Sequence, residues 1–128
     1  MSDQKSNNYG MEMILDLHNC NSELFTREII GRYFVDLCDL IDMNRADLHW
    51  WDDLDLPDDQ HDTEPHLKGT SAIQFITTSN ITIHSLDIMK RVYINLFSCK
   101  EFDPEIAKDF SATFFEGDVV SYHKIVRK

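Results

Sequence analysis

The feature that most limits the fold is a succession of three short strand-like segments in the middle of the chain. Ala72 to Thr78, Ile81 to His84 and Arg91 to Ser98 are rich in β-branched and aromatic residues. Such residues favour strands. Only short links separate the three segments, and short links join neighbouring antiparallel strands. The sequence therefore predicts a mainly antiparallel sheet at the centre of the fold.

Alternate positions of these segments differ in chemical character. Ile81 and Ile83 alternate with polar residues, and Val92, Ile94 and Leu96 do the same in the third segment. The opposite face would carry Asn80, Thr82, His84, Tyr93, Asn95, Phe97 and Cys99. Because successive strand side chains point to opposite faces, we expect helices over the aliphatic face. The polar and aromatic face is typical of a site between two sheets.

The flanking segments predict two helices and three further strands. Apolar residues recur at helical spacing from Leu24 to about Ile41, after a turn and cap at residues 19–22. Gly31 inside this helix indicates close packing or a bend. Asp103 and Pro104 predict the start of a second helix, which Gly117 would end. Strands are expected at residues 11–18, 48–51 and 119–126. The expected fold is α+β, a two-layer sandwich with both helices on one face of the sheet.

Two regions are expected to lie outside this framework. Residues 1–10 are polar and predict a flexible tail, so a single domain should span residues 11–128. Residues 52–64 hold seven acids and no Lys or Arg, and Pro57 and Pro65 interrupt the segment. We interpret residues 52–66 as a solvated acidic loop inserted into the domain.

Charge and composition exclude several functional classes. The formal net charge of −11 argues against nucleic-acid and anionic-membrane partners and suits a cationic small-molecule substrate. No apolar run is long enough for a membrane span, and the N-terminus lacks an apolar signal core, so a cytoplasmic location is expected. The three cysteines, Cys20, Cys38 and Cys99, suit reduced thiols better than disulfides.

Four residues of the central region carry a resemblance to a known family. Ser71, Ser79, His84 and Cys99 lie at intervals of eight, five and fifteen residues. The same intervals occur in the short bacterial form of S-adenosylmethionine decarboxylase, a pyruvoyl enzyme. Its pattern is Gly-Val-Ser-Gly, Glu-Ser-His-Ile-x-Ile-His-Thr and Phe-Thr-Cys. The segment Leu48 to Trp51 also resembles the His-x-Phe segment of that family.

The resemblance implies a mechanism and a role for each of these residues. The chain would cleave itself between Thr78 and Ser79, and Ser79 would become the pyruvoyl cofactor. His84 would act as the base, and Ser71 would hydrogen-bond the intermediate. The pyruvoyl group would form a Schiff base with the substrate amine, and Cys99 would return a proton to the substrate. The resemblance also implies a homodimer and the pathway that leads to spermidine.

The chain departs from the family pattern at positions that concern cleavage and substrate. Thr78-Ser79-Asn80 replaces Glu-Ser-His, although the acyl shift needs only the carbonyl of Thr78. After His84, the family's Thr-Trp-Pro-Glu, whose Glu holds the substrate ribose, becomes Ser85-Leu86-Asp87-Ile88. S-adenosylmethionine remains the first substrate hypothesis. Aromatic residues that could stack on its adenine are Trp50, Trp51, Tyr93 and Phe97.

Three alternatives remain open at this point. Ornithine or arginine needs no ribose contact, and Asp87 or the acidic loop could bind its side-chain cation. A homologue that does not cleave could instead bind and regulate a partner. A metal site at His49, His61 and His66 is the weakest alternative, because no paired spacing supports it, and no metal is expected. Taken singly, Cys99 is also typical of a buried small apolar residue.

Overall fold

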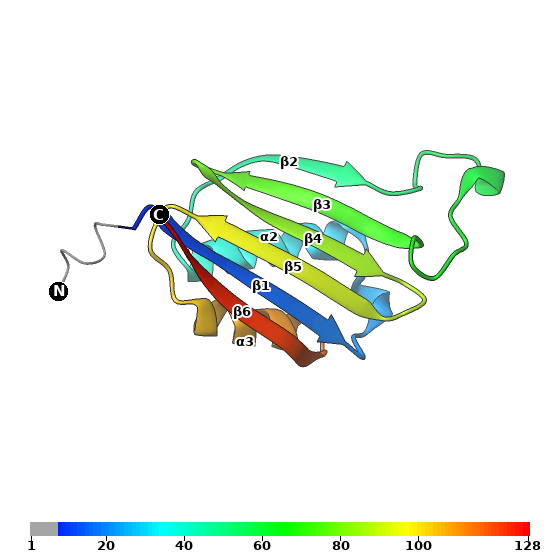
Figure 1. The fold of residues 1–128 in the computed structure, drawn as a ribbon. Coiled ribbons are helices and arrows are strands. Elements are labelled where there is room, and N and C mark those ends of the chain that lie inside the picture. The colour runs from blue at the N-terminus through cyan, green and yellow to red at the C-terminus, as the bar shows by residue number, and fades with distance from the viewer. Residues whose placement is uncertain (1–7) are drawn as a thin grey trace.

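A single six-stranded antiparallel sheet with two helices on one face forms the domain. The computed structural model describes residues 8–128, and its strand order is β2-β3-β4-β5-β1-β6. The strands are β1 (Gly10–His18), β2 (Arg45–Trp51), β3 (Gly69–Ile76), β4 (Ser79–Leu86), β5 (Arg91–Ser98) and β6 (Asp118–Arg127). The helices are α2 (Arg27–Leu40) and α3 (Pro104–Phe114), with 3₁₀ turns η1 (Ser22–Leu24) and η2 (Asp58–Gln60). The predicted α+β fold class is confirmed (Figure 1).

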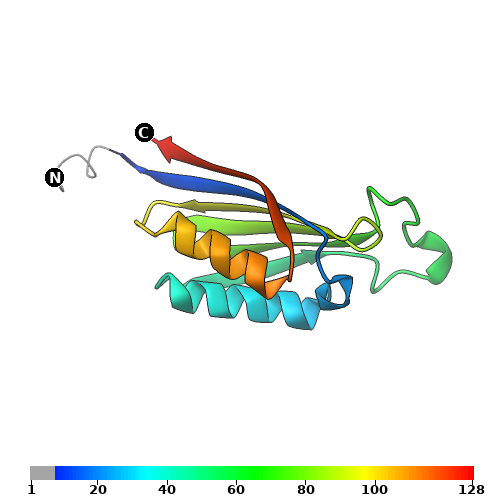
Figure 2. The same cartoon turned by 90° about the horizontal axis from the view of Figure 1, so that it is seen from below.

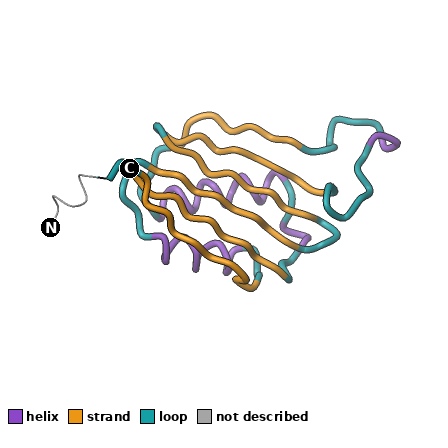
Figure 3. The backbone as a smooth tube through the Cα atoms, in the orientation of Figure 1, coloured by secondary structure: helices purple, strands orange, loops and turns teal. Residues whose placement is uncertain are grey.

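The two helices cover the aliphatic face of the sheet. Figure 3 shows α2 and α3 behind the strands, and Figure 2 shows them side by side in one layer on the same side of the sheet. Ile81, Ile83, Ile94 and Leu96 are 0% exposed beneath them. The opposite face, here called the free face, is turned toward the viewer in Figure 1. The alternation predicted for β4 and β5 is therefore confirmed on the helix side.

The N-terminal boundary of the domain differs from the prediction. Residues 1–7 of the predicted tail lie outside the described residues. The backbone N–H of Tyr9 donates to the carbonyl of Arg127, 2.8 Å away, and β1 begins at Gly10. Residues 9 and 10 are therefore paired with β6, and assigning them to a flexible tail was wrong.

Helix α2 begins later than its apolar pattern suggested. Thr26 is its N-cap, and the Thr26 hydroxyl accepts from the Ile29 N–H at 3.2 Å. Asn21 instead caps the short turn η1. The predicted start near Leu24 was wrong because a cap depends on backbone geometry, which apolar spacing does not specify. Of the two explanations predicted for Gly31, close packing was wrong, because a Cβ added there would meet only the Trp50 side chain, at 3.9 Å.

Helix α3 ends near Gly117 as expected, but Glu116 and not Gly117 takes the left-handed conformation there. Asp103 caps the helix and Pro104 opens it, as predicted. Glu116, with φ 55°, takes the left-handed conformation after the helix, and Gly117 does not. A Cβ on Gly117 would lie 2.5 Å from the Cys20 sulfur. Gly117 is therefore required for space rather than for its backbone angles.

The acidic segment between β2 and β3 is tied to the domain at its base. Figure 1 shows it extending beyond one end of the sheet. Asp52 accepts two hydrogen bonds of 2.7 Å from the Arg27 guanidinium, which holds the pKa of this carboxyl below its usual value. Asp53 accepts from the Asp62 N–H at 2.7 Å. The segment has internal contacts in addition to its solvated acids.

Candidate active site

Strand register brings four of the predicted site residues into one row across the free face. Trp51 pairs with Ser71, Ser71 pairs with His84, and His84 pairs with Tyr93. The Ser71 hydroxyl lies 2.7 Å from Nδ1 of His84. Gly69 starts β3 two residues earlier, and a Cβ there would collide with the Ser85 carbonyl. Glycine at this position therefore permits the close β3–β4 pairing that brings Ser71 to His84.

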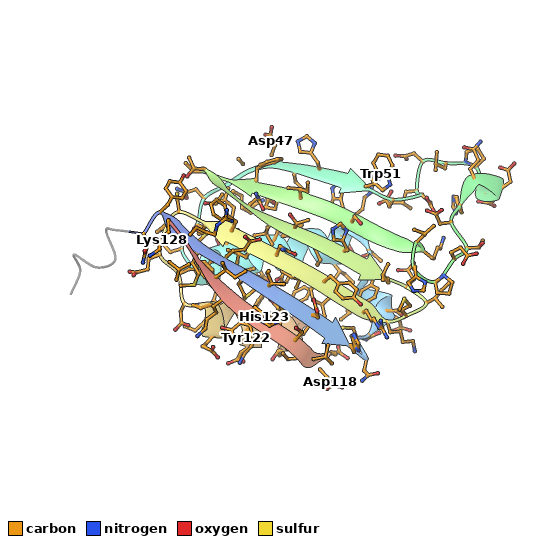
Figure 4. The ribbon with its side chains drawn as sticks, viewed as in Figure 1. Asp47, Trp51, Asp118, Tyr122, His123 and Lys128 are labelled. Atoms are coloured by element: carbon orange, nitrogen blue, oxygen red, sulfur yellow. The ribbon has the colours of Figure 1, made fainter. Side chains whose placement is uncertain are left out.

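An open cavity of about 330 Å³ lies along this row. Trp51, Ile73 and Thr82 line it together with Ser71 and His84. The Trp51 side chain is 82% exposed and lies at the end of β2 (Figure 4). The cavity therefore combines a hydroxyl–imidazole pair with an aromatic surface that a planar ring could stack on.

A second cluster lies at the opposite end of β4. The backbone N–H of Cys99 donates to the Ser79 hydroxyl at 3.1 Å. The Cys99 sulfur lies 2.7 Å from the Thr78 hydroxyl and 3.9 Å from that of Ser79. The Thr78 hydroxyl, and to a lesser extent the Ser79 hydroxyl, hold the pKa of the Cys99 thiol below its usual value. A lowered pKa makes this thiol a stronger acid.

The turn that joins β3 to β4 is strained at the residue before Ser79. Ile76 pairs with Ser79, so Thr77 and Thr78 alone form the turn. Thr78 has φ 56°, a left-handed conformation that is a genuine outlier for a β-branched residue. Such strain persists only where the surrounding structure enforces it, and it concentrates at reactive sites. The strained residue provides the carbonyl of the Thr78–Ser79 peptide bond.

The two clusters do not meet within one chain. His84 follows Ser79 by five residues on the same strand, which places them about 17 Å apart along it. This separation was not predicted, because the strand was expected to begin at Ile81 with Ser79 in the preceding link, whereas Ser79 is the first residue of β4. A single protomer therefore contains the Ser71–His84 pair and the Ser79–Cys99 pair as two separate clusters.

The remaining predicted contacts divide between these two ends. Phe97 pairs with Asn80 near the Ser79 end, and the ring of Tyr9 stacks on it at 6.1 Å. Tyr9 also hydrogen-bonds Cys99 and so helps to lower its pKa. Sequence reasoning missed Tyr9, because it fell within the predicted tail. The guanidinium of Arg27 lies 5.8 Å from the centre of the Trp50 ring, and Trp50 also lines the cavity beside Trp51.

Asp87 lies in the β4–β5 turn, where its environment does not favour a charge. Its Oδ1 atom is buried without a hydrogen-bond partner. Burial raises the pKa of Asp87, and nearby Lys68 only partly opposes this. The residue lines a cavity of about 210 Å³ with Thr26 and Lys68. That cavity is at the start of α2, on the helix side, whereas His84 faces the free side.

Metal and membrane features are absent from the part of the chain that the structure describes. Within residues 8–128, no three His, Cys, Asp or Glu side chains are grouped so that they could hold a metal ion. His49, His61 and His66 accordingly form no such group. Over the same residues, no helix is long and apolar enough to cross a membrane.

Comparisons with known proteins agree with this fold. The profile of the family described as S-adenosylmethionine decarboxylase matches residues 11–128. The crystal structure of the adenosylmethionine decarboxylase from Aquifex aeolicus VF5 superimposes with a TM-score of 0.67 at 16% sequence identity. That match covers 94% of this chain and 89% of the other. No curated protein matches the sequence.

Proposed function

This chain belongs to the S-adenosylmethionine decarboxylase family, and we propose that it is a self-processing, pyruvoyl-dependent decarboxylase of S-adenosylmethionine. The strained Thr78–Ser79 turn is the observation that carries this proposal. Thr78 has φ 56°, and the Ser79 hydroxyl, fixed by the Cys99 N–H at 3.1 Å, lies next to its own peptide bond. The residues at this turn fit the formation of a pyruvoyl group from Ser79.

Processing begins with attack by the Ser79 oxygen on the Thr78 carbonyl carbon. The C–N bond breaks, the nitrogen takes a proton, and an ester links Thr78 to the Ser79 oxygen. A base then removes the Ser79 α-proton, its electron pair forms the Cα–Cβ double bond, and Thr78 leaves as a carboxylate. Water finally replaces the nitrogen, which departs as ammonia. Cleavage of a strained peptide bond relieves the strain, so the turn favours the first step.

His84 is the proposed base, and a second protomer is needed to deliver it. The Ser71 hydroxyl engages Nδ1 of His84 at 2.7 Å, which leaves Nε2 to take a proton. A two-fold axis running across the strands would place the Trp51–His84 row of one protomer over the Thr78 end of the other. Exposed apolar side chains on the free face, among them Ile73 and Phe75 at 38% and 42%, support burial against a second copy.

Turnover then depends on Cys99 and on the cationic substrate. A pyruvoyl group supplies a carbonyl that reacts with the substrate amine and accepts the electrons released with CO2. Cys99, whose thiol has a lowered pKa, is placed beside Ser79 to return a proton to the substrate. Asn80 and Phe97 flank this end on the free face.

The free face supports S-adenosylmethionine over ornithine or arginine. Trp51 offers an exposed ring beside Ser71 and His84, as adenine stacking requires. The net charge of −11 attracts each of these cationic substrates and does not discriminate between them. Asp87, the carboxylate predicted to bind the side-chain cation of ornithine or arginine, lies on the helix side with a raised pKa, although Asp16 pairs with Tyr93 on the free face.

Intact mass spectrometry followed by a decarboxylation assay tests the proposal. Purified protein should consist of two chains, of 78 and 50 residues, and the shorter one should begin with a pyruvoyl group. The Ser79→Ala variant should remain a single chain. Processed protein should release CO2 from labelled S-adenosylmethionine and not from ornithine or arginine. Wild-type protein that stays intact after long incubation would favour a non-catalytic homologue instead.

Sedimentation tests the homodimer separately. The wild-type protein should sediment as a dimer at micromolar concentration, and Phe75→Asp on the free face should shift it toward the monomer and slow processing. A processed wild-type monomer would show that one chain suffices.

A further inference from the structure

A small cavity at the strained turn is lined by a basic side chain, that of Lys100, which has no role in the proposed mechanism so far. The cavity has a volume of about 200 Å³ and is bounded by Thr77, Thr78 and Ser79. Asp42 and Lys100 also line it. Among its described lining residues, Lys100 is the single basic side chain and Asp42 the single acidic one. The cavity is therefore close to neutral before cleavage.

Hydrogen bonds between the Ser98 hydroxyl and the backbone of Lys100 fix the position of Lys100. The Ser98 hydroxyl accepts from the Lys100 N–H at 2.9 Å and donates to the Lys100 carbonyl at 2.7 Å. Ser98 is itself fully buried, so it fixes the turn that presents both Cys99 and Lys100. The Lys100 ammonium donates to the Asp42 backbone carbonyl and lies 3.0 Å from the Asp42 carboxylate.

The ion pair with Asp42 is weak enough to be exchanged. The Lys100 and Asp42 side chains are 55% and 96% exposed, and exposed ion pairs contribute little to stability. The proposed cleavage creates a new carboxylate, that of Thr78, in the same cavity. A negative charge that develops during a reaction is stabilised by a cation already positioned beside it.

We infer that Lys100 assists self-processing by stabilising the Thr78 carboxylate as it leaves. The inference rests on the proposed function and concerns its elimination step, in which the Ser79 Cβ–O bond breaks and the electron pair goes to the Thr78 carboxylate. Asp42 opposes this step, because its carboxylate competes for Lys100 and repels the new charge. Lys100 therefore favours the elimination step, and Asp42 opposes it.

Opposite effects of the two substitutions distinguish this role from a structural one. Lys100→Met should slow elimination by about twofold to fivefold, and Lys100→Arg should restore most of the rate. Asp42→Asn breaks the same ion pair but should speed elimination by about twofold to fivefold. Asp42 has φ 59°, a conformation that asparagine adopts readily, so this variant should fold. Lys124→Met, on β6 and away from the turn, is the control and should process at the wild-type rate.

Trapping the ester identifies the step that is affected. Hydroxylamine cleaves the ester and leaves an N-terminal serine at position 79, which intact mass distinguishes from a pyruvoyl group. Lys100→Met should accumulate this ester, whereas wild type should not. Equal slowing by Lys100→Met and Asp42→Asn, or slowing without ester, would overturn the inference and indicate a structural ion pair. A wild-type protein that is neither cleaved nor sensitive to hydroxylamine would instead refute the proposed function.

Discussion

Replacing Thr78 with glycine should stabilise the uncleaved protein and slow its cleavage. Thr78 has φ 56°, and a left-handed conformation costs a residue with a Cβ roughly 1–2 kcal/mol. Glycine avoids this cost but loses about 0.5–1 kcal/mol through the greater freedom of its unfolded chain. The Thr78 hydroxyl is exposed, so the loss of its contacts should matter little to stability. The net expectation is a gain of about 0.5–1 kcal/mol in the free energy of unfolding.

The gain should be measured in a background that cannot cleave. Thr78→Gly with Ser79→Ala is compared with Ser79→Ala alone by urea unfolding, at one protein concentration because the protein is proposed to dimerise. Thr77→Gly is the matched control. Thr77 is the other turn residue and has no positive φ, so glycine there should lower stability by about 0.5–1 kcal/mol.

The effect on the rate of cleavage is measured in Thr78→Gly protein that keeps Ser79 and can therefore cleave. If the strain is released when the Thr78–Ser79 bond breaks, removing about 1 kcal/mol of it should slow chain cleavage roughly fivefold. Denaturing gels over time measure the rate. The reasoning is refuted if Thr78→Gly fails to stabilise the uncleaved chain, or if it stabilises the chain and leaves the cleavage rate unchanged.

Three further substitutions test other parts of the structure. Cys99→Ala should still cleave, but its decarboxylation should fall at least about tenfold; full activity measured as CO2 release would remove the thiol from the mechanism. Asp87→Asn should stabilise the protein at neutral pH. The pKa of Asp87 is raised in the folded state, so ionisation of Asp87 destabilises the wild-type protein as pH rises through that pKa. The difference in the free energy of unfolding between Asp87→Asn and wild type, measured by urea unfolding, should therefore shrink below the ordinary pKa of the carboxyl. Gly31→Ala in α2 should raise the free energy of unfolding by about 0.5–1 kcal/mol, since the added methyl has space; a loss of stability would mean that this contact with Trp50 is tighter than 3.9 Å.

Local patterns in the sequence were sufficient for the order of the elements and for the family, although Thr77 and Thr78, predicted in a strand, form the β3–β4 turn. The alternation of Ile81 and Ile83 with polar residues depends only on the strand repeat, and the structure buries both. Asp103 and Pro104 define a helix start through their own backbone preferences, and α3 begins there. The spacing of Ser71, Ser79, His84 and Cys99 led to the family that the comparisons support over residues 11–128.

Tertiary structure decided which of those four residues meet. Strand pairing places Ser71 beside His84 and Ser79 beside Cys99, at opposite ends of β4. It also strains Thr78 and brings Lys100 to the same cavity as the turn. These relations depend on strand register and on the direction of each turn, which join residues distant in sequence. Residue spacing along one strand gives the separation of Ser79 from His84, at about 3.4 Å per residue, but it does not show which distant segments pair with each end of that strand.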